Sequence, residues 1–166
     1  MSALIIREAG EADRPAVRAI VEAAFGQPAE ADLVERLVAD GDAVLELVAE
    51  RVDGIVGHVL FSRLVVETPQ GRFPAVALAP LAIAPAQQKQ GIGGALVQEA
   101  HDRLRLAGET LSVVLGDPSY YGRFGYEHAR ARGFESEYQS EALQALAWDE
   151  APATGRLVYA RAFSAP

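Results

Sequence analysis

The sequence predicts an α/β protein of the mixed α+β kind, with one mixed sheet of about seven strands and about four helices packed on it. Apolar runs typical of strands alternate with apolar residues at helical spacing, in the order β-α-α-β-β-β-α-β-α-β-β. Turn signals separate these segments. No repeat, low-complexity block or linker divides the 166 residues. We therefore expect a single domain over residues 1–166.

A strand and two helices open the predicted fold. The segment 3–8, ALIIRE, is typical of a strand, and Asp13, two residues before a proline, marks the start of the first helix. Gly26 ends this helix, and a second helix is expected at 30–39, closed by Gly41. Helical spacing is carried by Val17, Ile20, Val21, Ala24 and Phe25 in the first helix and by Leu33, Val34 and Leu37 in the second.

Three strands are expected next. The segment 44–51 is followed by Asp53-Gly54, a hairpin turn signal, and then by a long apolar strand at 55–67. A further strand is expected at 73–84, with Pro80 near its end. Because proline cannot donate a ladder hydrogen bond, Pro80 predicts a bulge or a splay in that strand.

The C-terminal half begins with an amphipathic helix and ends with strands. The helix is followed by a buried strand at 111–115 and by GDPSYYGRFGY at 116–126, a short helix or turn for which Asp117 suits the N-cap. Two more strands are expected at 142–148 and 157–163. The buried stripe of the amphipathic helix is formed by Leu96, Val97, Ala100 and Leu104.

Composition excludes several classes of function. The chain has no Cys, which excludes disulfides, thiolate metal sites and a Cys nucleophile, and its net charge of −8 argues against nucleic-acid binding. The three His are isolated, without H-E-x-x-H, and G-x-S-x-G is missing, so we expect neither a metal site nor a hydrolase elbow. The longest apolar run, 75–86, is too short for a bilayer and the start lacks a signal peptide, so we expect a soluble cytoplasmic protein without a membrane partner.

The glycine-rich segment 88–94, QKQGIGG, has the features of an anion site. Glycines let the backbone turn tightly and aim several N–H groups at one point, and the start of the following helix adds about half a positive charge. The alternative is a glycine-rich turn that binds nothing. Two familiar phosphate loops do not fit, because a Rossmann loop needs its third glycine where Leu96 stands and a Walker loop needs a Lys-Ser or Lys-Thr pair.

The pattern Gln88-x-x-Gly91-x-Gly93 resembles the Q/R-x-x-G-x-G/A loop of the GNAT superfamily of acyl-CoA-dependent N-acetyltransferases. The strand LAPLAIAP precedes it, a helix follows it, and YYGRFGY, 26 residues beyond Gly94, is similar to the family's FYEKLGF element. The segment GDPSYYGRFGY and the ending GRLVYARAF resemble a bacterial branch of predicted N-acetyltransferases. The order of elements matches as well, so the resemblance covers nearly all of the chain.

The resemblance implies transfer of an acetyl group from acetyl-CoA to a primary amine by direct attack in a ternary complex. A non-catalytic acyl-CoA-binding or regulatory module is the alternative. The resemblance assigns the CoA pyrophosphate to backbone N–H groups of Gln88, Lys89, Gln90, Gly91, Ile92 and Gly93, with Gly94 close by. It assigns the pantetheine arm to Leu81, Ala82 and Ile83, in a slot made by a splayed strand. It makes Tyr121 the general acid for the departing thiolate, with Tyr120 as the alternative.

Other roles stay open at this stage. Ala86 and Gln87 depart from the acidic and aromatic residues common before the loop in the family. Glu46, His58 and Glu67 are candidates for the general base, and His101 is expected to face solvent. Trp148, Tyr138 and Phe134 lie where the family shapes an acceptor pocket, with core packing as the alternative for each. The acceptor is an amine of a small molecule or a peptide, and a homodimer is an expectation from the family alone.

Overall fold

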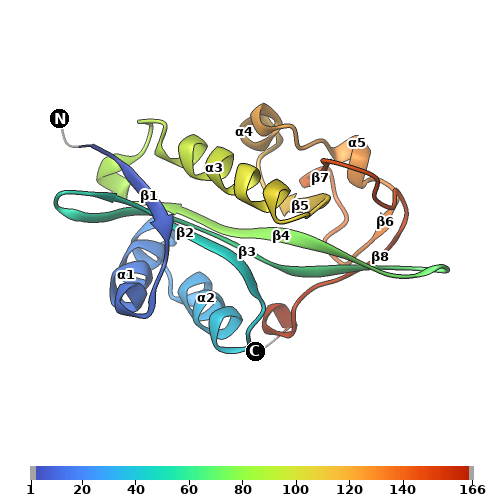
Figure 1. The fold of residues 1–166 in the computed structure, drawn as a ribbon, viewed down its shortest axis with the longest axis horizontal. Helices are drawn as coiled ribbons and strands as arrows, with labels where there is room; N and C mark the ends of the chain where they lie inside the picture. The colour runs from blue at the N-terminus through green and yellow to red at the C-terminus, as the bar shows by residue number, and fades with distance from the viewer. Residues whose placement is uncertain (1–2, 165–166) are drawn as a thin grey trace.

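One mixed sheet organises the protein in the computed structural model, which describes residues 3–164 (Figure 1). The ends of the predicted domain, 1–2 and 165–166, lie outside the described residues. The strands follow the order β1-β2-β3-β4-β5-β7, and β8 pairs with β3 and β6. The pairs β4–β5 and β6–β8 are parallel and the others antiparallel. The eight strands are β1 Ile5–Glu8, β2 Ala43–Arg51, β3 Gly54–Thr68, β4 Gly71–Ile83, β5 Leu111–Leu115, β6 Phe134–Glu135, β7 Leu143–Ala147 and β8 Gly155–Val158.

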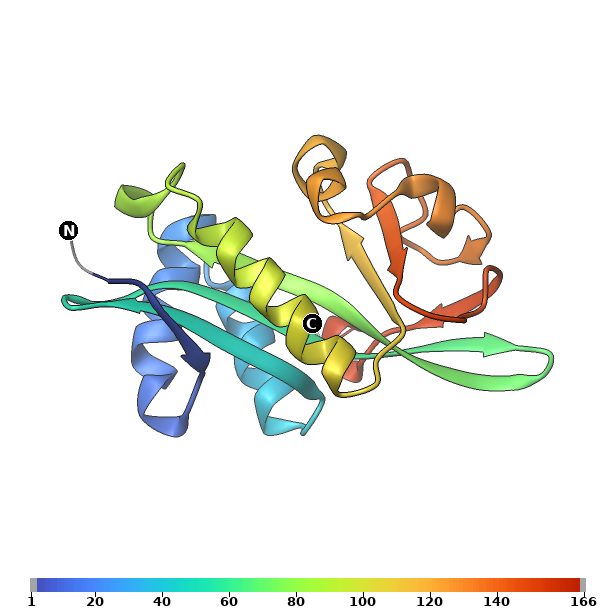
Figure 2. The ribbon, with the colours of Figure 1, turned by 45° about the horizontal axis from the view of Figure 1, so that its top comes forward.

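Helices cover both faces of the sheet. Helices α1 (Arg14–Phe25) and α2 (Ala29–Ala39) lie on one face, and α3 (Ile92–Leu106) crosses the other (Figures 1 and 2). Two four-residue helices, α4 (Pro118–Tyr121) and α5 (His128–Ala131), follow β5. The mixed α/β prediction is therefore confirmed, and no helix in the described part of the chain is long and apolar enough to cross a membrane.

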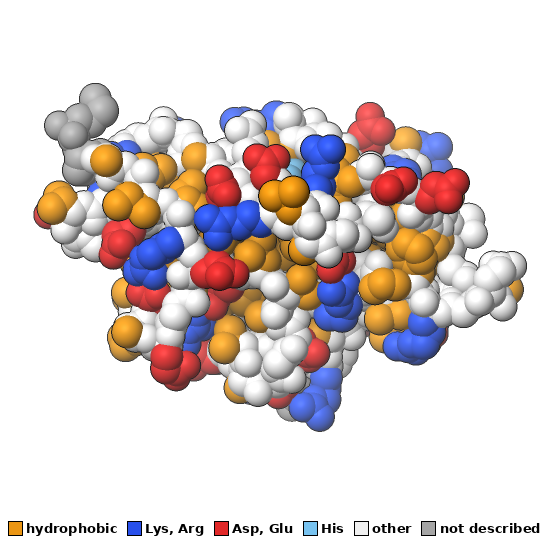
Figure 3. Space-filling model, viewed as in Figure 1, with side chains coloured by type: hydrophobic (Ala, Val, Ile, Leu, Met, Phe, Trp, Pro, Cys, Tyr) orange, Lys and Arg blue, Asp and Glu red, His pale blue; other side chains and the backbone are white. Residues whose placement is uncertain are grey.

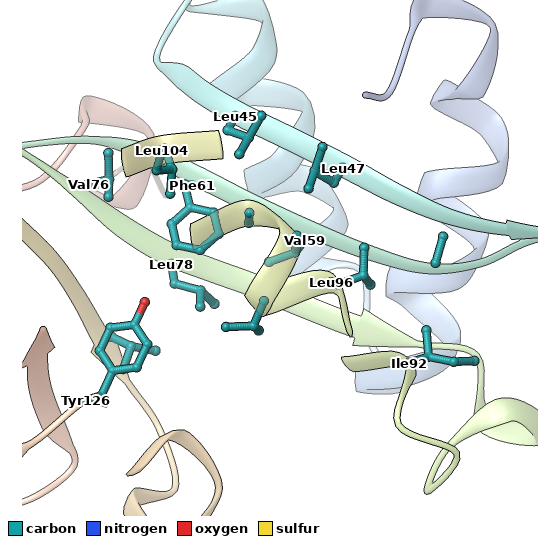
Figure 4. Packing of buried hydrophobic residues seen from close by; sticks show 14 of the residues in the cluster. Leu45, Leu47, Val59, Phe61, Val76, Leu78, Ile92, Leu96, Leu104 and Tyr126 are labelled. Carbon is teal, nitrogen blue, oxygen red and sulfur yellow. The ribbon is translucent and has the colours of Figure 1, made fainter. Parts of the chain in front are cut away.

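The core has one layer on each side of the sheet. The predicted apolar stripe of α3 is buried, and Leu96 and Leu104 pack on Leu47, Val59 and Phe61 from the sheet (Figure 4). On the opposite face, α1 and α2 bury Val17, Val21, Val34 and Leu37 against Val48 and Leu60. The helical spacing read from the sequence therefore identified the buried faces of all three long helices, except that Phe25, at the end of the predicted apolar face of α1, is 42% exposed.

The start of α1 differs from the prediction in one detail. The helix begins at Arg14, after a 3-10 turn over Glu11–Asp13, and the Asp13 carboxylate makes no capping bond to α1. It accepts hydrogen bonds from the backbone N–H of Gly10 at 2.7 Å and from Arg7 at 2.8 Å. The guanidinium of Arg7 is the stronger partner and holds the pKa of Asp13 at about 2.

Strands β4 and β5 part near Pro80, which positions the site described below. Their parallel pairing covers only Val76–Leu78 of β4, although β4 continues to Ile83. On the other side of β4, the register against β3 shifts between the pairs Val59–Leu81 and Phe61–Leu78. The predicted irregularity at Pro80 is therefore confirmed as a bulge, and the last residues of β4 have no partner in β5.

The C-terminal region contains the errors of the sequence prediction. The strand expected at 157–163 is β8, which ends at Val158, and a 3-10 turn follows at Arg161–Ser164. The turn buries Ala162 against the α1–α2 layer, which a continuing strand could not reach. Helix α5 and strand β6 were not predicted because four and two residues are too few to show a period.

Candidate functional site

The loop between β4 and α3 has a tightly turned backbone. A 3-10 turn at Pro85–Gln87 leads into the glycine-rich segment, and Gly91, with φ of 83°, stands at the N-cap of α3. Lys89 has φ of 66°, the left-handed conformation that among the described residues is otherwise confined to glycines. Such a conformation in a non-glycine residue costs about 1 kcal/mol or more and is found chiefly at functional sites.

A cavity of about 470 Å³ opens beside this loop. Its walls come from the end of α1, the end of β4, the loop with the first turn of α3, and the segment that follows β5. The lining residues are Ala24, Phe25, Leu81, Ile83, Gln87, Gln88, Lys89, Gly91, Ile92, Gly93, Gly94, Tyr120 and Arg123.

Most of the residues predicted to bind the cofactor line this cavity. Eight of the ten do, and the exceptions are Ala82 and Gln90. The Ala82 side chain is buried in the α1–α2 layer, which leaves only its backbone for the predicted pairing. Sequence reasoning missed Arg123, although it lies inside the YYGRFGY segment, and missed Ala24 and Phe25, for which the sequence carried no signal.

The cavity is locally basic in an acidic protein. Lys89 and Arg123 line it, and no carboxylate is among the described lining residues. The Arg123 guanidinium lies over the Tyr120 ring at 4.6 Å, which orients it at the cavity wall. Acidic and basic side chains are interspersed over the face in Figure 3, so a cavity without acids is a local feature of a chain with net charge −8.

The two predicted proton donors occupy different places. The Tyr120 hydroxyl lies directly over Gly93, where it would clash with any added Cβ, and Tyr120 lines the cavity. The Tyr121 ring packs against Gly116, just beyond β5, and does not line the cavity. Burial, reinforced by Tyr120, raises the pKa of Tyr121 to about 12, so its hydroxyl keeps its proton at neutral pH.

A buried polar network lies behind Tyr121. The Tyr126 hydroxyl meets Ser112 Oγ at 2.8 Å and His101 Nε2 at 2.9 Å, and the His101 ring packs edge-on against Trp148 at 5.1 Å. The expectation that His101 faces solvent is therefore wrong, since its exposed fraction is 8%. Burial lowers the pKa of His101 to about 4, so the ring is neutral near pH 7.

The three candidate bases lie away from the cavity. His58 Nε2 is 2.8 Å from a carboxylate oxygen of Glu46, which also pairs with Arg14 of α1, and neither candidate lines the cavity. Burial alone would raise the pKa of Glu46, but the hydrogen bonds from His58 and Arg14 outweigh it and keep the pKa below its usual value. Glu67 pairs with Arg72 and Arg156 near the β3–β4 turn.

The three residues expected near the acceptor have different surroundings. Tyr138 lines a second, smaller cavity, Phe134 is a core residue with 2% exposure, and Trp148 packs on His101. Within residues 3–164, no three His, Asp or Glu side chains are grouped so that they could hold a metal ion.

Comparison with known proteins identifies relatives over most of the chain. Residues 5–129 match the family model of the acetyltransferase (GNAT) domain. The chain is 36% identical over 148 residues to the uncharacterized N-acetyltransferase YhbS of Escherichia coli, covering 84% of this chain and 87% of YhbS. It is 37% identical over 131 residues to the uncharacterized N-acetyltransferase YjhQ of the same species, covering 77% and 72%.

Solved structures agree with these relationships. The structure of Escherichia coli YhbS in complex with CoA superimposes with a TM-score of 0.91 at 32% identity, covering 99% of this chain and 94% of that one. A GNAT family acetyltransferase from Brucella melitensis in complex with acetyl-CoA gives 0.82 at 31% identity, covering 97% and 98%.

Proposed function

The chain belongs to the GNAT family of N-acetyltransferases, which are acyltransferases, and on this premise we propose that it moves an acetyl group from acetyl-CoA to a primary amine. The observation that carries the proposal is the basic cavity at the start of α3, which is lined by the glycine-rich loop in which Lys89 has a left-handed backbone. Two similar structures contain acetyl-CoA or CoA, which supports the same cosubstrate here.

The residues of the cavity suit CoA. Backbone N–H groups from Gln88 to Gly94 and the α3 N-terminus favour a pyrophosphate, and Lys89 and Arg123 add two positive charges. Beyond Leu78, β4 has no partner in β5, so backbone groups of Leu81–Ile83 are available to pair with the amide-bearing pantetheine arm. Its thioester end would then lie near the point where β4 and β5 part.

The proposed reaction is direct attack in a ternary complex. An alkyl amine with a pKa near 10.4 is mostly protonated in neutral water, so it must lose a proton first. The neutral amine nitrogen then bonds to the acetyl carbon and becomes cationic, the C–S bond breaks, and Tyr121 gives its proton to the sulfur while the proton lost by the cationic nitrogen restores the tyrosine. Holding the two reactants together supplies much of the rate, since effective molarities reach roughly 10⁵–10⁸ M. No residue is assigned as the base.

Tyr121 is the proposed donor because it packs beside the end of β5, close to the parting of the strands. Tyr120 lies over the first turn of α3 and is proposed to contact the cosubstrate there. The alternative function, an acyl-CoA-binding module, would use the same cavity without releasing CoA.

Calorimetry with acetyl-CoA tests the proposal. Gly91→Val forces a branched residue into φ of 83°, and Gly93→Val drives a side chain into the Tyr120 hydroxyl, so each is expected to weaken binding at least about 100-fold. Gly41→Val is the matched control, because Gly41 has φ of 76° and open space around it but lies outside the cavity. Failure of the unaltered protein to bind any acyl-CoA would reject both functions, and binding without CoA release from any amine would leave the binding module.

We further propose that the whole chain is one acetyltransferase domain, supported by the single sheet that joins its strands and by structural relatives aligned over 97% or more of it. The cytoplasmic location and the homodimer stay predictions.

A further inference from the structure

A second cavity lies at the parting of β4 and β5. It measures about 210 Å³ and is lined by residues 77–79 of β4, residues 113–115 of β5, and the rings of Tyr138, Tyr159 and Phe163. These rings form a continuous aromatic wall, with Tyr138 and Tyr159 edge-to-face at 5.2 Å and Tyr159 and Phe163 at 5.3 Å.

The two cavities meet the same stretch of β4. Ala79 lines the second cavity and Leu81 lines the cosubstrate cavity, and only Pro80 separates them in the strand. A thioester that reaches the parting of the strands from the cosubstrate side is therefore next to the second cavity. A nucleophile bound in the second cavity would then lie beside the acetyl carbon.

The side chains that line the second cavity restrict which ligands can bind in it. No charged side chain is among the described residues that line it. Glu137 is exposed and precedes Tyr138 in the chain, and burial together with this carboxylate raises the pKa of Tyr138. Burial likewise raises the pKa of Tyr159 to about 12. Both hydroxyls therefore stay neutral, and one carboxylate beside Tyr138 suits one ammonium group.

We propose that this cavity is the acceptor subsite and that it selects monoamines carrying one aromatic or branched apolar group, of the size of 2-phenylethylamine or 3-methylbutylamine. The inference rests on the proposed acetyl transfer. An apolar cavity of about 150 Å³ is enough to hold a benzene ring, so 210 Å³ accommodates one such group. Polyamines and aminoglycosides carry several charges that this wall cannot pair, and burying them unpaired is strongly unfavourable.

Binding to the CoA-loaded protein tests the proposal without turnover. Saturation-transfer NMR with 2-phenylethylamine, 3-methylbutylamine, spermidine and kanamycin is expected to show contact of the first two with the protein and none at this cavity from the others. CoA release should follow the same order. Absence of binding by both apolar amines would overturn the proposal, as would faster turnover of spermidine or kanamycin.

Two variants locate the binding. Tyr138 lies in a partly exposed loop and lines the cavity. Tyr138→Ala is expected to weaken the apparent affinity for the aromatic amine in turnover about tenfold or more, because the ring of the amine loses an apolar partner. Tyr138→Phe is expected to keep this affinity. Leu115 is 49% exposed at the mouth, and Leu115→Asp is expected to shift the preference about tenfold toward a diamine such as cadaverine. Unchanged apparent affinities for the amines in both variants would overturn the proposal.

The acetyl-CoA titration distinguishes a wrong acceptor subsite from a wrong proposed function. If acetyl-CoA binds normally and charged acceptors are acetylated while the apolar amines are not, the acceptor subsite is wrong and the acetyltransferase stands. If acetyl-CoA does not bind, the proposed acetyl transfer and the acceptor subsite are both wrong.

Discussion

The cosubstrate cavity and the second cavity described above are built in opposite ways. Seven of the thirteen residues that line the cosubstrate cavity come from the continuous segment 87–94. The second cavity is lined by five separate segments between Ala77 and Phe163, none longer than three residues. The first depends on the path of the backbone, and the second depends on which side chains five segments bring together.

Because of this difference, the first cavity can recognise its ligand through backbone groups, and the second can recognise its ligand only through side chains. Backbone N–H groups are the same in every residue, so a loop needs only glycines at the right positions to hold a phosphate. A wall made of Tyr138, Tyr159 and Phe163 depends on side-chain identity, and single substitutions can change what it accepts. We expect changes in the first cavity to abolish activity and changes in the second to redirect it.

The largest expected effect concerns Tyr121, which lines neither cavity and packs against Gly116 beside the end of β5. Tyr121→Phe should lower kcat by about 10²–10⁴-fold through loss of the proton donor, with little change in the acetyl-CoA Kd. Tyr120→Phe should instead change the acetyl-CoA Kd, since its hydroxyl lies over Gly93. Steady-state kinetics and calorimetry of both variants measure the difference. The reverse pattern, with kcat lost only in Tyr120→Phe, would move the donor into the cosubstrate cavity.

Glu46, His58 and Arg14 form a charged cluster outside both cavities, so a substitution in this cluster should change stability and not activity. Glu46→Gln leaves His58 and Arg14 without their carboxylate partner, and breaking such a buried group is expected to reduce the free energy of unfolding by about 3 kcal/mol. Urea denaturation measures it. Glu67→Gln is the control, because its pairs with Arg72 and Arg156 are half-exposed and should contribute within about 1 kcal/mol. A large loss of kcat in folded Glu46→Gln would instead make Glu46 part of the active site.

The buried His101 makes stability depend on pH. Its pKa is about 4 in the folded protein against 6.5 when free, so the unfolded chain takes up its proton first as the pH falls. Stability is complete above pH 6.5 and declines toward pH 4, by about 3 kcal/mol in total for this group. In His101→Gln, which keeps a partner for Tyr126 and does not titrate, this decline should disappear. Chemical denaturation of both proteins between about pH 4 and 8 measures the difference, and parallel curves would contradict it.

The smallest expected effect lies at the start of α4. The Asp117 carboxylate accepts hydrogen bonds from the backbone N–H and hydroxyl of Ser119, as its sequence position predicted. Asp117→Ala should lower the free energy of unfolding slightly, because the first turn of α4 loses its capping hydrogen bonds. Because Tyr121 lies in this helix, kcat should fall more than the acetyl-CoA Kd changes, and Asp117→Asn should restore most of the loss. An equal effect of both variants would assign Asp117 another role.

Features encoded by residues close together in the chain were predicted correctly, and features that depend on residues distant in the chain were not. The long helices were correct because a 3.6-residue period records one buried face, and the bulge was correct because Pro80 lacks an N–H. His101 was misplaced because its partners, Tyr126 and Trp148, are 25 or more residues away along the chain. The strand expected at 157–163 was too long, since the chain leaves the sheet after Val158 and Ala162 packs in the α1–α2 layer, a long-range contact that local propensity does not record.

The sequence by itself determined the order of the elements, the buried faces of the long helices and the loop that resembles a CoA site, since each is encoded by residues close together in the chain. Tertiary structure alone decided that Arg123 and the end of α1 join that loop, that Tyr120 and Tyr121 occupy different places, and that three distant aromatic rings line one cavity. The physical reason is that backbone turns follow the local sequence, whereas the neighbours of a side chain are fixed only when the helices and strands have packed together.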